Sequence, residues 1–381
     1  MATVAIIHNH PIHYQHLLFC ELASQGMDFE VLFTARSSGI RVEVPLPANS
    51  GYLYSVGHDG PYEAASGVAT ARFVWKSLSR IQPAVVILCG YYDVAAWTGW
   101  LWAGVHGARR ILWTETNMFD RRRSPWRELP KRVFVARCDR AHTYGSSSRE
   151  YLEWLGMARD RIQSGRAMVN AALFLDADDT ETQRTGPIRL LFCGRLSAEK
   201  NLVTLLRAFA GLKQNTNSPR MVLKLVGHGP LEDSLRKLAG DLGIGELVEF
   251  AGSAPQAALP GIFRQLDVLI LPSTSETWGL VVNEAMLSGL AVAVSNRCGC
   301  VADLVRPENG WTFSPDSEGE LTKLLARIAD TPREVLQEMG RAGKSLATEY
   351  SPENCARAVV DMVNGLLSMP GRGALTAGFR N

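Results

Sequence analysis

Two glutamates in one short stretch, Glu276 and Glu284, give the first indication of chemistry in this chain of 381 residues. They lie in LDVLILPSTSETWGLVVNEAMLSGLAVAVS, where Glu284 sits in an otherwise apolar segment. A carboxylate accepts hydrogen bonds from the hydroxyls of a sugar. One acid on each side of an anion-binding element therefore suits a ligand with a hydroxylated ring at both ends, and a nucleotide sugar is such a ligand.

The residues around the two acids predict one strand, helix and strand in succession. Asp267–Leu271 predicts a strand buried on both faces, and the strand ends at Pro272. Leu280–Leu287 predicts a short helix that stops at Gly289, and Ala291–Val294 predicts the next buried strand. This pattern is typical of a parallel sheet covered by helices.

The predicted helix begins where ligands of such sheets bind. Ligands of open parallel sheets lie beyond the carboxyl ends of the strands, where the N-terminal N–H groups of helices attract anions. Trp278, Gly279 and Leu280 stand at this position. We therefore expect these three residues to contact the phosphate-bearing part of a donor.

Two cations follow another predicted strand. Arg195 and Lys200 lie in GRLSAEKN, between a strand predicted at Ile188–Cys193 and a helix predicted at Leu202–Leu212. A pair of cations at the carboxyl end of a strand suits a diphosphate leaving group, and arginine can bind it through two parallel hydrogen bonds. Ion pairing at the surface is the alternative interpretation.

These two segments resemble motifs of the retaining family-4 glycosyltransferases, which have the GT-B fold. Glu276 and Glu284, with seven residues between them and Gly279 inside, resemble the E-x7-E motif. The segment from Gly194 to Lys200 resembles the G-R-x-x-x-E-K motif, and the two motifs occur in the right order. A helix-capping Glu276 and a solvated Glu284 are the competing interpretation.

The resemblance implies an α/β protein of two Rossmann-like, doubly wound domains that face each other across a cleft. It also implies transfer of a sugar from a nucleotide-sugar donor to a hydroxyl, with retention of anomeric configuration and with neither a cofactor nor a metal. Arg195 and Lys200 would stabilise the departing diphosphate, Glu276 would hold the donor sugar and Glu284 the ribose. We expect a UDP-sugar rather than GDP-mannose, and a lipid-linked or polysaccharide acceptor.

Further donor contacts are expected in the second half of the chain. Gly227 follows the predicted strand Val222–Val226 in the sequence GHG, where backbone could approach a ligand closely. The third glycine of a dinucleotide-binding fingerprint is missing, which argues against an NAD enzyme. By resemblance, Gly252 and Ser253 follow the next predicted strand and face the base of the nucleotide.

The first loop of the chain departs from the family. Relatives carry a glycine pair here, whereas this chain has Pro11, Ile12, His13 and Tyr14. Four histidines fall within nine residues, but no cysteine or acid accompanies them, so we predict no metal site. His13 and Tyr14 are candidates for contact with acceptor or donor, and ordinary loop residues are the alternative.

Strands are predicted in the first half at Thr3–His8, Glu30–Phe33, Ala84–Leu88, Arg110–Trp113 and Arg140–Tyr144. Tyr91 and Tyr92 follow the third of these strands, where they could stack on a sugar or pack on their own helix. Glu115 follows the fourth, close to the place where many relatives have a histidine. It is a candidate catalytic residue that could hold an acceptor hydroxyl, and a plain loop acid is the alternative.

The segment from Arg121 to Arg140 is strongly basic. It contains eight basic and two acidic residues, together with Trp126 and Phe134. Such a helix can lie on an anionic membrane, where both aromatic side chains would insert, or it can be a solvated helix. Nucleic acid is a poorer partner, because one charged helix without a known motif is weak support.

The length of the chain predicts two domains. We expect an acceptor-side domain at residues 1–170, a linker at 171–187, a nucleotide-sugar domain at 188–350, and a terminal helix within 351–381 that crosses back to the first domain. Residues 1–175 carry 19 basic against 14 acidic residues, and the remainder carries 21 against 24. Asp176 and Asp178 form a D-x-D sequence, which we assign to a solvated linker rather than to a metal site.

The seven cysteines are an odd number without C-x-x-C spacing, and the N-terminus does not resemble a signal peptide. These features predict a reduced, cytoplasmic protein, with membrane contact at most peripheral because the apolar runs are short. Two other functions use the same donor pocket. One is a nucleotide-sugar epimerase of related fold, and the other is a non-catalytic nucleotide-sugar sensor.

Overall fold

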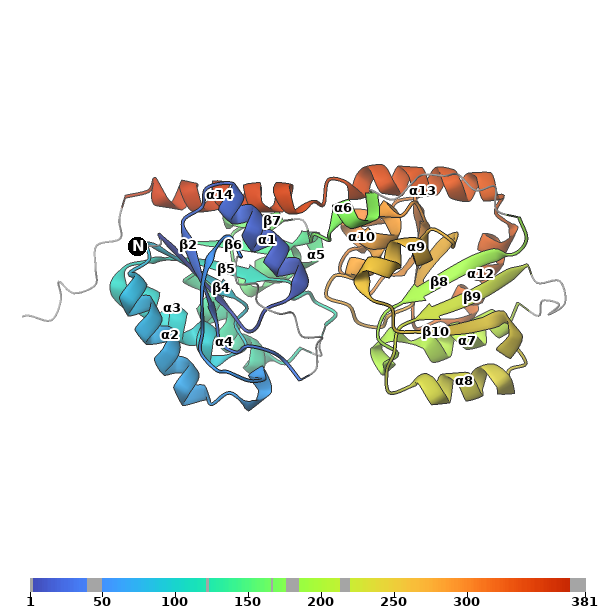
Figure 1. The fold of residues 1–381 in the computed structure, drawn as a ribbon, viewed down its shortest axis with the longest axis horizontal. Helices are drawn as coiled ribbons and strands as arrows, with labels where there is room; N and C mark the ends of the chain where they lie inside the picture. The colour runs from blue at the N-terminus through green and yellow to red at the C-terminus, as the bar shows by residue number, and fades with distance from the viewer. Residues whose placement is uncertain are drawn as a thin grey trace, which may run out of the picture. The chain divides into compact units, whose positions relative to one another are not determined.

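The computed structural model describes residues 3–39, 50–120, 123–165, 167–175, 185–212 and 220–370. The chain forms two compact units (Figure 1). Unit 1 contains Met1–Met118, Arg122–Arg166 and Pro352–Asn381, and unit 2 contains Phe119–Arg121 and Ala167–Ser351. Each unit has its own parallel sheet with helices packed on it, as expected for a doubly wound α/β domain.

Unit 1 has a seven-stranded parallel sheet in the order β3-β2-β1-β4-β5-β6-β7. Its strands are β1 Val4–His8, β2 Phe29–Phe33, β3 Leu53–Val56, β4 Val85–Cys89, β5 Arg109–Thr114, β6 Arg140–Tyr144 and β7 Ile162–Gly165. Its helices are α1 His13–Ser24, α2 Gly67–Ile81, α3 Val94–His106, α4 Pro125–Ala136, α5 Gly145–Leu155 and α14 Pro352–Leu367. The strand order reverses between β1 and β4. Ligands of such sheets bind at this point, beyond the carboxyl ends of the strands, so the loops after β1 and β4 lie at the ligand-binding end of the sheet.

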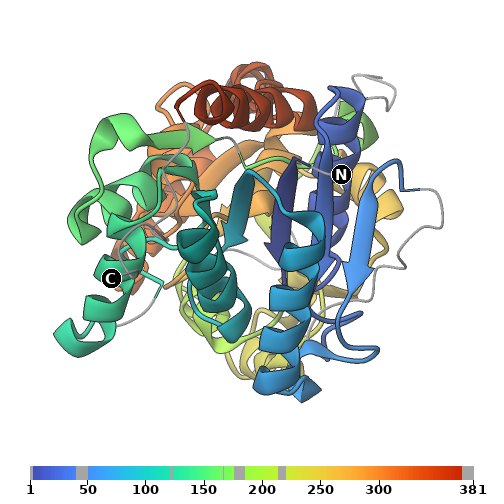
Figure 2. The ribbon, with the colours of Figure 1, turned by 90° about the vertical axis from the view of Figure 1, so that its left-hand side faces the viewer.

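Helices cover both faces of the unit 1 sheet. Helices α2 and α3 lie on one side and α1 and α14 on the other, as Figure 1 and the rotated view of Figure 2 show. Every residue of β1 is buried, because a central strand between two helical layers has no solvated face. Asp93 caps the N-terminus of helix α3, because its carboxylate accepts a hydrogen bond of 2.8 Å from the N–H of Ala96.

The last helix, α14, packs in unit 1 although it follows unit 2 in the sequence. The side chain of Gln25 at the end of α1 donates a 3.0 Å hydrogen bond to the carbonyl oxygen of Glu353. The sulfur of Cys355 lies 3.9 Å from Nε2 of His142, which is buried on β6. Helix α14 therefore forms part of the core of unit 1.

Unit 2 has a six-stranded parallel sheet in the order β10-β9-β8-β11-β12-β13, which reverses between β8 and β11. Its strands are β8 Ile188–Cys193, β9 Met221–Val226, β10 Val248–Gly252, β11 Val268–Leu271, β12 Ala291–Ser295 and β13 Gly310–Phe313. Its helices are α6 Ala171–Leu175, α7 Leu202–Ala210, α8 Glu232–Asp241, α9 Leu259–Phe263, α10 Leu280–Leu287, α11 Val301–Leu304, α12 Glu318–Asp330 and α13 Arg333–Ala347. Among the residues that the structure describes, no helix is both long enough and apolar enough to cross a membrane.

The segment predicted as a linker differs from the prediction. Residues 171–175 form helix α6, and the division between the units falls at residue 167 rather than at 171. The reason is that Phe174 is fully buried and its ring centroid lies 6.0 Å from that of Phe263. Asp176 and Asp178 lie outside the described residues.

Candidate functional site

The two motifs of unit 2 meet through their charged side chains. The ammonium group of Lys200, in the turn after β8, donates a hydrogen bond to the carboxylate of Glu276 in the loop after β11. These residues are 76 positions apart in the sequence. The backbone N–H of Thr274 also donates a 2.8 Å hydrogen bond to the carbonyl oxygen of Glu199, so the two loops are joined by backbone as well. Both charged side chains remain partly exposed and can reach a ligand.

The loop of Glu276 is held by the turn that follows β12. The N–H of Gly299 donates to the carbonyl oxygen of Glu276 at 3.1 Å, and the N–H of Cys300 donates to that of Trp278 at 3.2 Å. Burial, followed by the nearby Glu276 carboxylate, raises the pKa of Cys298, so its thiol stays protonated. The C-G-C sequence is therefore a tight turn that fixes the backbone of the acidic loop.

Trp278 is placed differently from the expectation of a donor contact. Its side chain is only 1% exposed, its indole N–H donates a 2.8 Å hydrogen bond to Asn283, and its ring lies against Tyr350. The indole therefore belongs to the core of unit 2. Gly279 follows with a φ of 100°, where a side chain would be strained, and Leu280 starts helix α10. The first N–H groups of α10 remain suitable for an anion.

Glu284 is 4% exposed, which excludes the interpretation as a solvated acid. It lies near the end of β8, since burial and then the Glu284 charge raise the pKa of Cys193 to about 12. A carboxylate at this position can accept hydrogen bonds from the hydroxyls of a ribose.

Gly227 is required by the packing of loops. It has a φ of 135°, and a Cβ on it would come within 1.9 Å of the carbonyl oxygen of Gly194. Its N–H donates a 2.8 Å hydrogen bond to the carbonyl oxygen of Gly252, so the ends of β8, β9 and β10 lie backbone to backbone. Ser253 follows and is exposed. The glycine thus brings three strand ends together, whether or not it also touches a ligand.

Arg195 is exposed, and its side chain has no hydrogen bond or ion pair with another residue in the described part of the chain. The neighbouring Glu199 accepts a 2.5 Å hydrogen bond from Ser197, and this bond is the main reason why the pKa of Glu199 is lowered. The guanidinium group of Arg195 is therefore available to a phosphate.

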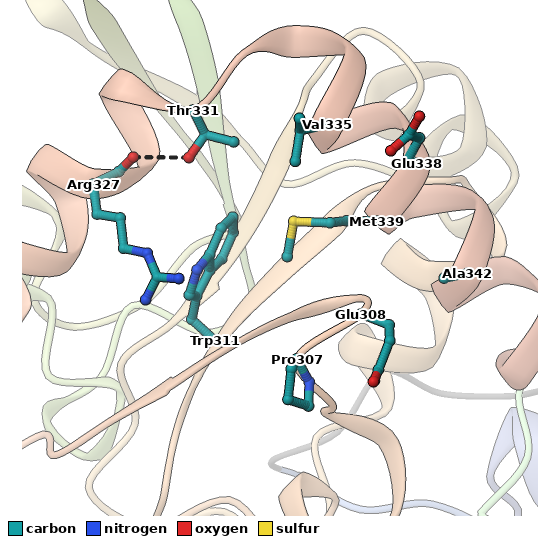
Figure 3. A pocket seen from close by; sticks show the side chains of 9 residues that line it. All are labelled: Pro307, Glu308, Trp311, Arg327, Thr331, Val335, Glu338, Met339 and Ala342. Carbon is teal, nitrogen blue, oxygen red and sulfur yellow. Dashed lines mark hydrogen bonds between the residues drawn. The ribbon is translucent and has the colours of Figure 1, made fainter.

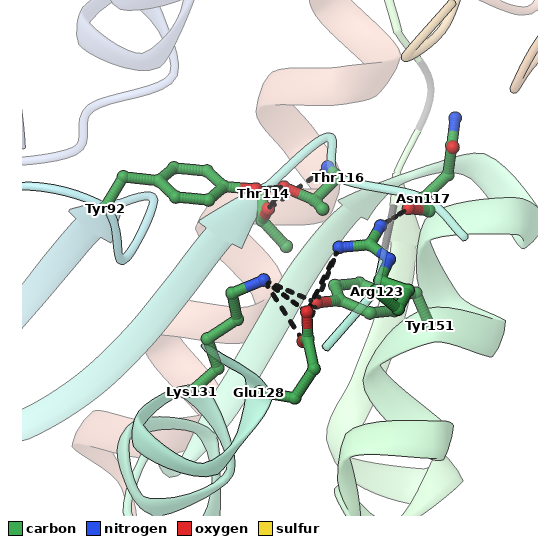
Figure 4. Close-up of polar contacts among 8 residues, drawn as sticks. All are labelled: Tyr92, Thr114, Thr116, Asn117, Arg123, Glu128, Lys131 and Tyr151. Atoms are coloured by element: carbon green, nitrogen blue, oxygen red, sulfur yellow. Dashed lines mark hydrogen bonds and ion pairs between the residues drawn. The ribbon is translucent and has the colours of Figure 1, made fainter. Parts of the chain in front are cut away.

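The two tyrosines at the end of β4 in unit 1 have different surroundings. Tyr91 is 3% exposed and packs against Phe134, whereas Tyr92 is 54% exposed and its hydroxyl lies 2.5 Å from that of Thr116 (Figure 4). Tyr91 is therefore a core residue, and Tyr92 remains a candidate for stacking on a sugar. Glu115, next to Thr116, is exposed.

A buried ionic cluster adjoins these tyrosines. The carboxylate of Glu128 on α4 lies 2.9 Å from Lys131 and 3.6 Å from Arg123, and it accepts a 2.5 Å hydrogen bond from Tyr151 (Figure 4). Burial would raise the pKa of Glu128, but the hydrogen bonds from Tyr151 and Lys131 and the two positive charges outweigh it, so the pKa is lowered. The cluster ties α4 to α5 and to the loop after β5, where Arg123 also bonds Asn117.

This cluster changes the interpretation of the basic segment. Arg123 and Lys131 point inward, and Arg132 lies over the ring of Trp154. The expectation that Phe134 inserts into a membrane is wrong, because Phe134 is 0% exposed and packs between Trp97 and Trp100. Trp126 is 84% exposed. Arg121 and Arg122 lie outside the described residues.

The histidines near the N-terminus make separate contacts. Nδ1 of His8 lies 2.9 Å from the carbonyl oxygen of His10, and Nδ1 of His16 lies 3.0 Å from the hydroxyl of Tyr52. His13 is half-buried, with its ring edge toward Tyr14. Within the described ranges, no three histidine, cysteine or acidic side chains lie close enough together to hold a metal ion.

Tyr144 was not singled out from the sequence. It ends β6, and burial, followed by the nearby charge of Glu115, raises its pKa. It therefore shares the ligand-binding end of the unit 1 sheet with Glu115 and, through a hydrogen bond, with Gln15. Its position at the carboxyl end of a predicted parallel strand is the signal that could have identified it.

The structural neighbours of the chain define its fold. A structure of Anabaena HepE in complex with UDP matches with a TM-score of 0.74 and 16% identity, over 96% of this chain and 100% of that chain. Sucrose-phosphate synthase from Thermosynechococcus elongatus matches with a TM-score of 0.76 and 19% identity, over 97% and 100%. With two parallel-sheet α/β domains and these neighbours, the chain has the GT-B fold.

Residues 176–346 match the family described as glycosyl transferases group 1. D-inositol 3-phosphate glycosyltransferase of Streptomyces griseus is 35% identical over 214 residues, which are 54% of this chain and 43% of that protein. 2-Deoxystreptamine glucosyltransferase of Streptomyces kanamyceticus is 30% identical over 175 residues, which are 46% and 44%. The chain thus matches less than half the length of these relatives.

Proposed function

We propose that this protein is a retaining glycosyltransferase that moves a sugar from a nucleotide-sugar donor to an acceptor hydroxyl without a metal ion. The observation that carries the proposal is the contact of Lys200 with Glu276, which joins the two motifs at the ligand-binding end of the unit 2 sheet. A UDP-sugar is the favoured donor, and neighbours of the same fold have been solved with UDP and with UDP-glucose.

In the proposed reaction, the bond between the anomeric carbon and the diphosphate oxygen breaks as negative charge grows on the diphosphate. Lys200 has three N–H donors, so it can keep its contact with Glu276 while it binds a phosphate oxygen. Arg195 adds a second cation, and together they replace the charge that a metal would supply. The acceptor oxygen forms the new bond to the anomeric carbon, and its proton passes to the departing phosphate oxygen, so no protein nucleophile is needed.

Glu276 and Glu284 divide the recognition of the donor. Glu276 is partly exposed in the loop beside Lys200 and would accept hydrogen bonds from the hydroxyls of the sugar. Glu284 is buried near the end of β8 and would accept hydrogen bonds from the ribose. On the unit 1 side, Tyr92, Glu115 and His13 are the proposed acceptor contacts.

A thermal-shift screen against UDP, GDP and ADP sugars, followed by turnover with the donors that bind, tests the proposal. We expect UDP release that depends on an added acceptor, and a product with the anomeric configuration of the donor, measured by NMR. Donor conversion without acceptor would indicate an epimerase, and tight binding without any turnover would indicate a sensor. Either result would overturn the proposal.

We also propose that the acceptor is lipid-linked and that α4 brings unit 1 to an anionic membrane. Trp126, Leu129 and Val133 are spaced along one face of α4 and are all exposed, and Arg127 beside them is exposed as well. Each cation near an anionic surface contributes about 1 kcal/mol, and this contribution is weakened by salt. A small soluble acceptor would give no reason for such a face.

Liposome flotation tests the membrane proposal. The wild-type protein should float with anionic but not with neutral vesicles, and high salt should weaken the binding. Trp126→Ser with Arg127→Ala should reduce the bound fraction, whereas Lys224→Ala, on the sheet of unit 2, should leave it unchanged. Absence of binding to anionic vesicles at low salt would remove the membrane from the proposal.

A further inference from the structure

Unit 2 has a pocket of about 500 Å³ away from the candidate donor site (Figure 3). It lies between the edge strand β13 and the helices α12 and α13. Its lining includes Pro307 and Glu308, which precede β13, whereas Lys200 and Glu276 follow the carboxyl ends of β8 and β11. Because all strands of the sheet are parallel, the pocket opens toward the other end of the sheet. Its volume is in the range of pockets that hold small ligands.

The inner surface of the pocket is apolar and flat. Figure 3 shows the indole of Trp311 and the thioether of Met339 directed into the space, with Val335 above them. Trp311 is half-buried, and Met339 is buried. An indole presents a broad apolar face together with one N–H donor, a combination suited to a ligand that is apolar on one side and polar on the other.

The rim of the pocket carries three charged side chains, those of Glu308, Arg327 and Glu338. All three are exposed, and none forms a hydrogen bond or ion pair through its side chain within the described residues. The two carboxylates accept hydrogen bonds and the guanidinium group donates them, so a ligand hydroxyl can act either as donor or as acceptor at the rim. Elsewhere on unit 2, exposed charges such as Arg220 and Asp330 are paired.

The charge balance narrows the class of ligand. The rim has two negative charges and one positive charge, which disfavours a phosphate or another anion. A purely apolar ligand would bury parts of three charged groups without hydrogen-bonding them, which costs free energy. A neutral, polyhydroxylated ring fits both parts of the pocket, because its C–H face packs on the indole while its hydroxyls reach the rim.

We propose that this pocket is a second, non-catalytic binding site for a neutral saccharide. The choice of a glycan among polyhydroxylated ligands rests on the proposed function, whereas the pocket itself is separate from the donor site. In this arrangement the protein holds a glycan chain at the edge of unit 2, which raises the local concentration of acceptor or product.

Affinity electrophoresis tests the proposal with the full chain. The protein is run on native gels that contain glycogen, dextran or galactomannan, and on a gel without polysaccharide. We expect the wild-type protein to be retarded on at least one of the polysaccharide gels. Trp311→Ala and Arg327→Ala should both migrate as on the empty gel, and Trp126→Ala, which removes an exposed indole of unit 1, should be retarded like the wild type.

Two further measurements keep the result decisive. Because Arg327 is exposed, Arg327→Ala folds even if Trp311→Ala does not, and the UDP-induced thermal shift of each variant reports an intact unit 2. Lys200→Ala, which tests the donor site, should leave the retardation unchanged, so failure of the proposed reaction and failure of this site are distinguishable. No retardation of the wild type on any gel, or retardation that survives both pocket variants, overturns the proposal.

Discussion

The two units share one architecture but differ in the residues at the ligand-binding ends of their sheets. In unit 2 that end carries Arg195, Lys200, Glu276 and Glu284, and the family match lies within this unit. In unit 1 the same end carries tyrosines and histidines and lies outside the matched segment. Seven of the eight histidines of the chain are in this unit. Under the proposed function, a diphosphate and a ribose demand fixed chemistry, so the donor-binding unit would be recognisable from residue types, whereas the acceptor-binding unit would be free to vary.

The surfaces of the units differ as well. Of the 16 exposed large apolar side chains in the described part of the chain, 13 belong to unit 1. Seven of the nine tryptophans are also in unit 1, among them the exposed Trp126. Unit 1 thus has most of the exposed apolar surface, and unit 2 has the charged residues of the proposed donor site. The following predictions test this division.

The largest expected effect is a loss of unit 1 stability in acid. Burial lowers the pKa of His142 from 6.5 to about 4, so the unfolded chain takes up a proton that the folded chain does not. Stability should therefore be complete above pH 6.5 and fall by about 3 kcal/mol as the pH drops to 4. Urea unfolding at several pH values, monitored by tryptophan fluorescence, measures the free energy of unfolding, mainly that of unit 1.

The control for this prediction compares substitutions of a histidine in unit 1 and a histidine in unit 2. His142→Gln should flatten the dependence of unfolding free energy on pH. His228→Gln, at an exposed histidine of unit 2, should leave the fall in stability between pH 6.5 and 4 in place. An unaltered slope in the His142 variant would show that acid sensitivity is not a property of this buried ring.

The next effect concerns the chemistry of unit 2. Lys200→Ala removes a cation from the growing negative charge of the diphosphate and should lower kcat about 100-fold or more. Arg195→Ala should act in the same direction. Lys224→Ala is the matched control, because Lys224 pairs with Glu249 on the sheet of the same unit. Wild-type turnover in a folded Lys200→Ala protein would remove this residue from the mechanism.

A smaller effect is expected from the ionic cluster of unit 1. Glu128→Gln leaves Lys131 and Arg123 without their buried counter-charge and should lower the unfolding free energy by about 2 kcal/mol. Tyr151→Phe removes the hydroxyl that donates to Glu128 and accepts from Arg123 and Lys131, and should cost about 1–2 kcal/mol. The affinity for UDP, measured by calorimetry, should stay the same in both variants. A large change in UDP affinity would contradict the separation of the two units.

The smallest effect separates the two acids of unit 2. Glu276→Gln should weaken binding of the whole donor about tenfold and leave binding of UDP nearly unchanged, because it removes a charge-assisted hydrogen bond to the sugar. Glu284→Ala should weaken UDP and the whole donor alike. Both affinities can be measured by calorimetry. Equal losses of UDP binding in the two variants would refute the assignment of sugar to one acid and ribose to the other.

The central elements were predictable from the sequence. Strand β8 and helix α10 have the predicted bounds, since each is a mostly apolar stretch between clear start and stop signals. The edge strands β3, β7 and β13 were missed, because each is four residues long and only partly buried. Short edge strands lack the apolar pattern on which sequence reasoning depends.

The site was predictable in its residue types but not in its contacts. The charge motifs indicate Lys200 and Glu276 separately, whereas their contact depends on a sheet that brings β8 and β11 together. Tyr91 and Tyr92 are adjacent and chemically identical, yet one is buried and the other exposed. Glu128 lies in a segment whose charge predicts a solvated face, but the fold buries it. Tertiary packing decides all three cases.

The placement of helix α14 also bears on the order in which the chain folds during its synthesis. Vectorial translation releases the strands of unit 1 first, but unit 1 is completed by Pro352–Leu367, which emerge after all of unit 2. Until then, α1 lacks the helix that packs on it, and His142 lacks its neighbour Cys355. We therefore expect unit 2 to reach its native packing on the ribosome before unit 1, which reverses the usual N-terminal-first order of domain folding.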